Sequence, residues 1–156
     1  MSLAKDIVER ASAAGIVIAT AESCTGGMIS AAITAIAGSS HVLDRGFVTY
    51  SNAAKMDMLG VSAETLDTQG AVSEQVAAEM AAGALKHSNA TLSVSVTGIA
   101  GPGGSDFKPE GRVCFGMATN EGVETQQIDF GALGRTSVRE ATVAHALELL
   151  LEKLPN

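Results

Sequence analysis

The chain has 156 residues, which fits one domain of ordinary size and excludes a large multidomain enzyme. Hydrophobic residues make up 46% of the chain and aromatic residues only 3%, so we expect a core of small and aliphatic side chains. Ten Lys and Arg residues against seventeen Asp and Glu residues give a formal net charge of −7. Such a surface repels nucleic acid and anionic lipid, so an anionic ligand must be bound locally.

The remaining composition predicts a soluble cytoplasmic protein. The two cysteines, Cys24 and Cys114, have neither the spacing of a zinc site nor that of a disulfide framework. The first residues are amphipathic and carry acids, unlike a signal peptide. No apolar run approaches the roughly 18 residues of a membrane-spanning helix, so we expect no membrane partner.

Hydrophobic periodicity and turn residues predict helices that alternate with short buried strands. The first half of the chain predicts a helix from Leu3 to a stop at Gly15, a strand over 16–20, a helix ending near Ala37, a strand over 46–50 and a helix that begins at Ser51 or Asn52. A short helix over 62–66 and a long helix over 73–86 follow. The rest of the chain predicts a strand over 92–97, a hairpin of strands over 111–119 and 123–129, and a helix over about 136–151. The pattern predicts one α/β domain over residues 1–156, a three-layer α/β/α sandwich around a mixed, mainly parallel sheet.

Three predicted strand ends carry residues suited to chemistry. They are the segments 22–27, 50–55 and 97–105. In α/β sheets the ligand crevice lies beyond the carboxyl ends of the strands. If the three strands are neighbours, these loops converge on one crevice.

The first loop places Ser23 just before a helix, whose free amides point back toward it. Such amides can stabilise the oxyanion that forms when a hydroxyl attacks a carbonyl. Gly26 and Gly27 would let the backbone approach a ligand closely. The simpler interpretation is that Ser23 or Thr25 only caps the helix, because such caps are common. Ala21 stands where the nucleophile elbow of an α/β-hydrolase has glycine, which argues against that class.

The second loop supplies a candidate base for that serine. The amine of Lys55 can serve if burial lowers its pKa. Tyr50, the single tyrosine of the chain, could relay a proton or hold the amine in place. Taken alone, these residues would more often be an exposed helix lysine and a half-buried tyrosine.

The third loop, over residues 98–105, has the glycine spacing of a phosphate-binding loop. Gly104 stands where a P-loop has its lysine, so hydrolysis of a nucleoside triphosphate is poorly supported. From the loop alone, a site for a monophosphate and a structural turn are equally good interpretations.

A cysteine nucleophile is the alternative to Ser23. Cys24 is the adjacent residue, and the available bases are His41, His87 and His145. None of these histidines stands at a predicted strand end, so the pattern favours Ser23.

The chain resembles the C-terminal domain family of the competence-damage-inducible protein CinA. Five segments carry the resemblance, in one order and at one spacing: residues 20–27, 38–40, 50–55, 70–73 and 97–104. Ala37 stands where this family often has proline, and residues 105–107 fall in a variable part of the loop.

This resemblance implies hydrolysis of the carboxamide of nicotinamide mononucleotide (NMN) to nicotinate mononucleotide and ammonia, in pyridine nucleotide recycling, with no metal or other cofactor. It implies that Ser23 is the nucleophile, that Lys55 is its general base and that Tyr50 assists proton transfer or positions the lysine. A homo-oligomer is also expected. The residues predicted to contact the substrate are Thr25, Gly26, Gly27, Thr97, Gly98, Gly101, Gly103 and Gly104.

Two functions from other classes compete with the enzyme. A glycine-rich cradle can bind a nucleotide without reacting, which would make the chain a non-catalytic binding module. The alanine-rich helices expected over 28–37 and 73–86 could instead pack against copies of themselves in an oligomeric scaffold.

Overall fold

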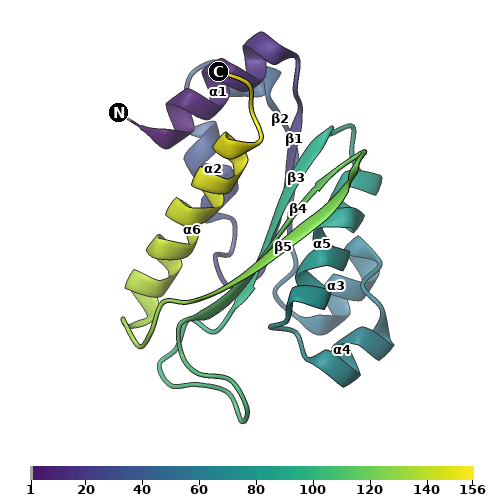
Figure 1. The fold of residues 1–156 in the computed structure, drawn as a ribbon, viewed down its shortest axis with the longest axis vertical. Coiled ribbons are helices and arrows are strands. Elements are labelled where there is room, and N and C mark those ends of the chain that lie inside the picture. The colour runs from purple at the N-terminus through teal and green to yellow at the C-terminus, as the bar shows by residue number, and fades with distance from the viewer. Residues whose placement is uncertain (1) are drawn as a thin grey trace.

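The computed structural model describes residues 2–156 and contains one five-stranded sheet (Figure 1). Its strands, in the spatial order β2-β1-β3-β4-β5, are β1 (Ile18–Glu22), β2 (Leu43–Val48), β3 (Leu92–Gly98), β4 (Arg112–Thr119) and β5 (Gly122–Asp129). Strand β1 pairs in parallel with both β2 and β3, whereas β4 pairs antiparallel with β3 and β5. The predicted α/β fold with a mixed sheet is therefore confirmed.

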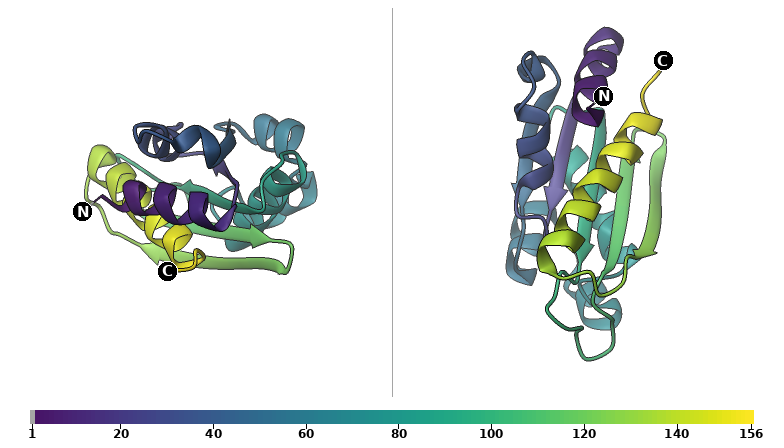
Figure 2. Two further views of the ribbon diagram at one scale, coloured as in Figure 1. Left: turned by 90° about the horizontal axis from the view of Figure 1, so that it is seen from above. Right: turned by 90° about the vertical axis from the view of Figure 1, so that its left-hand side faces the viewer.

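Helices cover both faces of this sheet (Figures 1 and 2). One layer holds α1 (Leu3–Ala14), α2 (Met28–Thr34) and α6 (Arg135–Glu152), and the other holds α3 (Asn52–Leu59), α4 (Ala63–Gln69) and α5 (Glu74–Lys86). A single 3-10 turn, η1 (Ser39–His41), precedes β2. No helix in residues 2–156 is both long enough and apolar enough to cross a membrane.

Local capping residues set several helix ends as the sequence predicted. Gly15 ends α1 in the left-handed conformation, with a φ of 69° that glycine adopts without strain. The hydroxyls of Ser51 and Ser73 accept hydrogen bonds from the first turns of α3 and α5. These side chains satisfy backbone N–H groups that would otherwise lack an acceptor.

Four elements differ from the prediction by more than one residue at an end. Strand β1 covers 18–22 instead of 16–20, and β2 covers 43–48 instead of 46–50. Helix α2 ends at Thr34, before the predicted end near Ala37, and α4 runs on to Gln69, beyond the predicted end at Leu66. The reason for the β1 shift is non-local, since Glu22 is paired on both sides, with Val48 of β2 and Val96 of β3.

Small side chains allow the layers to approach closely, as the composition predicted. The hydroxyls of Ser93 and Ser95 on β3 donate to backbone carbonyls of α5. In α5, a Cβ atom at Gly83 would lie 2.0 Å from the carbonyl oxygen of Leu59. The glycine therefore lets α5 pack directly on α3, the helix that carries Lys55.

Candidate active site

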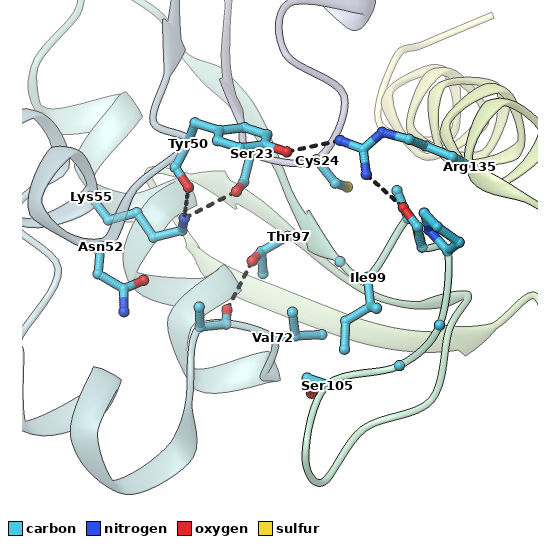
Figure 3. Close-up of a pocket in the computed structure, with 17 residues that line it drawn as sticks. Ser23, Cys24, Tyr50, Asn52, Lys55, Val72, Thr97, Ile99, Ser105 and Arg135 are labelled. Atoms are coloured by element: carbon cyan, nitrogen blue, oxygen red, sulfur yellow. Dashed lines mark hydrogen bonds between the residues drawn. The ribbon is translucent and has the colours of Figure 1, made fainter.

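The three predicted loops do converge, on a cavity of about 360 Å³ at the carboxyl ends of β1 and β3 (Figure 3). Its lining consists of Ser23, Cys24, Tyr50, Asn52, Lys55, Ala71, Val72, residues 97–105 and Arg135. Lys55 and Arg135 are the basic side chains of this lining, and none of the lining residues is a carboxylate. The cavity is thus locally basic in a chain whose net charge is −7.

The amine of Lys55 lies at the centre of this site. Lys55 is only 1% exposed, and its Nζ lies 3.0 Å from Ser23 Oγ. The same Nζ donates to the backbone carbonyls of Thr49, at 2.9 Å, and Tyr50, at 3.3 Å. Among residues 2–156 no carboxylate forms an ion pair with this lysine. Burial lowers the pKa of Lys55 from that of an ordinary lysine, because desolvation penalises the charged ammonium.

The Tyr50 hydroxyl lies away from this amine. The residue is 62% exposed, and its hydroxyl accepts a hydrogen bond of 2.9 Å from Nη2 of Arg135 (Figure 3). Only the backbone carbonyl of Tyr50 contacts Lys55. The tyrosine therefore contacts the lysine amine through its main chain, while its side chain joins Arg135 at the cavity wall.

Sequence reasoning missed Arg135. Its guanidinium also donates to the carbonyl of Gly101, at 2.6 Å, so it links the glycine-rich loop to the start of α6. Arg135 lies 85 residues beyond Tyr50, and no local pattern marks it as a site residue. One feature of the sequence could have indicated this residue: it is a basic residue directly after Gly134, in a chain predicted to bind an anionic ligand locally.

The glycine-rich loop lines the cavity as predicted, with Thr97, Gly98, Gly101, Gly103 and Gly104 among the lining residues. Some of its polar groups are already occupied. The Gly103 N–H donates to the carboxylate of Glu110, at 2.6 Å, and the Thr97 hydroxyl donates to the carbonyl of Ala71. The loop thus has fewer free amides than its glycine content suggested, and Arg135 adds a cation beside it.

The first loop is arranged differently from the prediction, since Thr25, Gly26 and Gly27 do not line the cavity. The Thr25 hydroxyl donates to the Glu22 carboxylate, at 2.5 Å, and the Gly26 N–H donates to the carbonyl of Ser23. Gly27 precedes α2 with a φ of 107°. These residues shape the turn that presents Ser23, because their polar groups bond within the turn itself.

The amides at the start of α2 do not face the cavity either. The N–H groups of Ile29 and Ser30 both donate to the carboxylate of Glu22. We expected free amides of this helix to stabilise an oxyanion. For Ile29 and Ser30 this expectation is wrong, because the buried Glu22 carboxylate already accepts both N–H groups.

The alternative cysteine nucleophile lacks a base. Burial raises the pKa of the Cys24 thiol to about 11, so the thiol stays protonated near neutral pH. None of His41, His87 and His145 lines the cavity. His145 instead packs against Phe115. The geometry thus favours Ser23 over Cys24.

Comparison with known proteins gives the family. Residues 1–154 match the model of the CinA C-terminal domain. The chain belongs to this family. It is 48% identical over 154 residues to the nicotinamide-nucleotide amidohydrolase PncC of Escherichia coli K12, an alignment that covers 98% of this chain and 93% of that protein. It is 54% identical over 138 residues to the protein of the same name from Enterobacter agglomerans, covering 87% and 84%.

Solved structures agree with this assignment. The crystal structure of the competence/damage inducible protein CihA from Agrobacterium tumefaciens superposes with a TM-score of 0.93, at 54% sequence identity. The match covers 96% of this chain and 92% of that one. The resemblance seen in the five sequence segments is thereby confirmed at the level of the family and the fold.

Proposed function

We propose that this chain hydrolyses the carboxamide of NMN to nicotinate mononucleotide and ammonia, with Ser23 as nucleophile and Lys55 as general base. The observation that carries the proposal is the 3.0 Å approach of a buried lysine amine to a serine hydroxyl at the cavity, with no carboxylate partner for that amine among residues 2–156. The names of the relatives, nicotinamide-nucleotide amidohydrolases, supply the substrate class.

The proposed mechanism needs Lys55 as a neutral amine, and its three contacts can accommodate one. Such an amine has two N–H donors and one lone pair. The carbonyls of Thr49 and Tyr50 can accept its two hydrogen bonds, which leaves the lone pair for the hydroxyl of Ser23. The hydroxyl then donates its proton toward Nζ, as a general-base mechanism requires.

The reaction follows in two halves. Ser23 Oγ forms a bond to the carboxamide carbon while its proton passes to Lys55 Nζ. The C–N bond of the resulting tetrahedral intermediate then breaks, and the leaving nitrogen takes that proton and departs as ammonia. A water molecule next attacks the acyl ester and gives its proton to Lys55. The ester bond breaks, and Ser23 recovers its proton from the lysine.

The oxyanion of the intermediate needs donors beside Ser23. Among the backbone hydrogen bonds of residues 2–156, none has the N–H of Cys24 as its donor, and Cys24 lines the cavity directly after the nucleophile. We assign the oxyanion to this amide, in place of the α2 amides that Glu22 occupies.

We assign the phosphate of the substrate to the part of the cavity that Arg135 and the glycine-rich loop line. Arg135 provides a planar cation there, and the loop over 98–104 provides backbone close to it. A guanidinium can bind phosphate oxygens through two parallel N–H groups. Tyr50 would support this subsite, because its hydroxyl holds the guanidinium.

Ammonia release from NMN by the purified chain tests the proposal. We expect turnover by the wild type and none above background by Ser23→Ala, with both proteins folded by circular dichroism. Tight binding of NMN without ammonia would instead support the non-catalytic binding module. No binding of any pyridine nucleotide would support the scaffold.

We further propose that the protein acts in the cytoplasm, in pyridine nucleotide recycling, as a homo-oligomer. Several large apolar side chains are exposed, among them Val48, Met58 and Leu133. Such residues mark an interface where they form one contiguous patch, which a homo-oligomer would bury. Light scattering coupled to size-exclusion chromatography measures the oligomeric state, and a monomer would contradict this part of the proposal.

A further inference from the structure

Glu22 is a buried carboxylate to which the proposed reaction gives no role. The residue is fully buried, and within residues 2–156 it forms no ion pair. Its Oε1 accepts hydrogen bonds from the Thr25 hydroxyl, at 2.5 Å, and the Ile29 N–H, at 2.9 Å. Its Oε2 accepts from the N–H and the hydroxyl of Ser30, at 3.0 and 3.1 Å. Four donors thus fill the acceptor positions of the ionised group.

These bonds join the two elements on either side of the nucleophile. Glu22 is the last residue of β1, and Ser23 follows it directly. Ile29 and Ser30 belong to the first turn of α2, and Thr25 lies between the two elements. The carboxylate therefore spans the turn from the end of the strand to the start of the helix.

Other hydrogen bonds hold the same turn. The Ser23 N–H donates to the carbonyl of Val96 on β3, which fixes the main chain of the nucleophile. Arg139 of α6 donates to the carbonyls of Cys24, at 3.0 Å, and Thr25, at 3.2 Å. Within residues 2–156, the Glu22 carboxylate is the side chain whose hydrogen bonds join this turn to the first turn of α2.

We propose that Glu22 is a positioning residue, whose carboxylate fixes the turn so that Ser23 Oγ stays within hydrogen-bond distance of Lys55 Nζ. This inference rests on the proposed function. Stability alone is a weak reason for such a group, because a buried charge is costly to desolvate and an apolar residue of similar volume is often as good. Placement of a reacting atom is a stronger reason, since small displacements of reacting groups can cost about a hundredfold in rate.

The first test is Glu22→Gln, which keeps the shape of the side chain. An amide offers one oxygen and one NH₂ group, so the NH₂ would face the N–H of Ser30, donor against donor. We expect kcat for ammonia release to fall at least about tenfold and KM to stay within about twofold, because the substrate contacts are unchanged. Asp44→Asn is the matched control. The Asp44 carboxylate also accepts a hydrogen bond from a backbone N–H, that of Asn89. Asp44 lies near the start of β2, at the end of the strand away from the cavity, so this variant should leave kcat unchanged.

A second pair of variants tests the same bonds more gently. Thr25→Val removes one donor to Glu22 and nearly keeps the side-chain volume, whereas Thr25→Ser retains the hydroxyl. We expect kcat to fall in Thr25→Val and to recover in Thr25→Ser, again with little change in KM. This pair decides the question if Glu22→Gln does not fold.

Covalent labelling separates this inference from the proposed function. The rate at which a fluorophosphonate modifies Ser23, followed by intact mass, reports the reactivity of the hydroxyl without NMN. We expect it to fall with kcat in Glu22→Gln and Thr25→Val. If the fluorophosphonate labels Ser23 of the wild type but NMN releases no ammonia, the proposed reaction is refuted. The labelling rates of the variants relative to the wild type would then still test whether Glu22 positions Ser23. Lower melting temperatures with unchanged kcat and labelling rates would show that Glu22 serves stability alone and overturn the inference.

Discussion

The amine of Lys55 lies 3.0 Å from the hydroxyl of Ser23, although 32 residues separate them in the chain. Lys55 belongs to α3 on one face of the sheet, and Ser23 directly follows β1, an interior strand of that sheet. Their meeting depends on the close packing of α3 against α5 and on the turn that Glu22 holds.

Replacement of Lys55 by methionine should abolish turnover without loss of the fold. Methionine has a similar length and needs no hydrogen-bond partner, so the buried site accepts it. We expect kcat to fall by at least about a thousandfold, in the range seen when general-base catalysis is removed. The measurement is ammonia release together with thermal unfolding.

Lys5→Met provides the matched control for that variant. Lys5 lies on the exposed face of α1, where its one ion pair is a long contact of 3.9 Å with Glu9. Its loss should change neither kcat nor the melting temperature appreciably. Comparable loss of activity in the two variants would contradict a specific role for Lys55.

The rate should rise with pH as Lys55 loses its proton. Burial lowers the pKa of this amine, so the neutral form becomes abundant at a pH below the usual pKa of lysine, about 10.4. We expect kcat to increase with pH and to level off before that value. A pH-rate profile of the wild type checks this, and a rate independent of pH across the neutral and alkaline range would rule out the lysine as base.

The same lowered pKa predicts a pH-dependent stability. Between the pKa of folded Lys55 and that of the unfolded chain, the unfolded state binds more protons, so the free energy of unfolding rises with pH. Wild type should therefore gain stability relative to Lys55→Met as the pH rises through this interval. Urea denaturation of both proteins, at about pH 7 and about pH 10, measures the difference. A gap that does not change with pH would indicate an amine of ordinary pKa.

Cys24→Ala should retain most of the activity that Ser23→Ala loses. The Cys24 thiol has a raised pKa of about 11 and is 6% exposed, so it is neither an available nucleophile nor a ready target for alkylation. We expect a modest loss of stability, of about 1 kcal/mol, from the small cavity left behind. If Cys24→Ala is the inactive variant and Ser23→Ala is active, the nucleophile is the cysteine.

Tyr50→Phe should act on substrate binding more than on the chemical step. The hydroxyl holds Arg135 and does not reach Lys55, whose contact is with the backbone carbonyl that phenylalanine keeps. We expect KM for NMN to rise about fivefold, the equivalent of about 1 kcal/mol, with kcat nearly unchanged. A fall in kcat at constant KM would instead support proton transfer by the tyrosine.

The sequence by itself determined the elements and the candidates. Helix ends follow from Gly15, Ser51 and Ser73, which cap their helices through contacts a few residues away. The short buried strands predicted the layered fold, and the general rule for strand ends brought Ser23 and Lys55 forward as candidates. Each of these features depends on neighbours in the chain, so a linear pattern contains it.

Only the tertiary structure decided which candidates meet and what surrounds them. It buried Lys55 against two carbonyls, turned the Tyr50 hydroxyl toward Arg135, and gave the first amides of α2 to Glu22. Desolvation and side-chain hydrogen bonds depend on residues brought together from distant parts of the chain. No local pattern contains that information, because packing of the sheet and its two helical layers creates it.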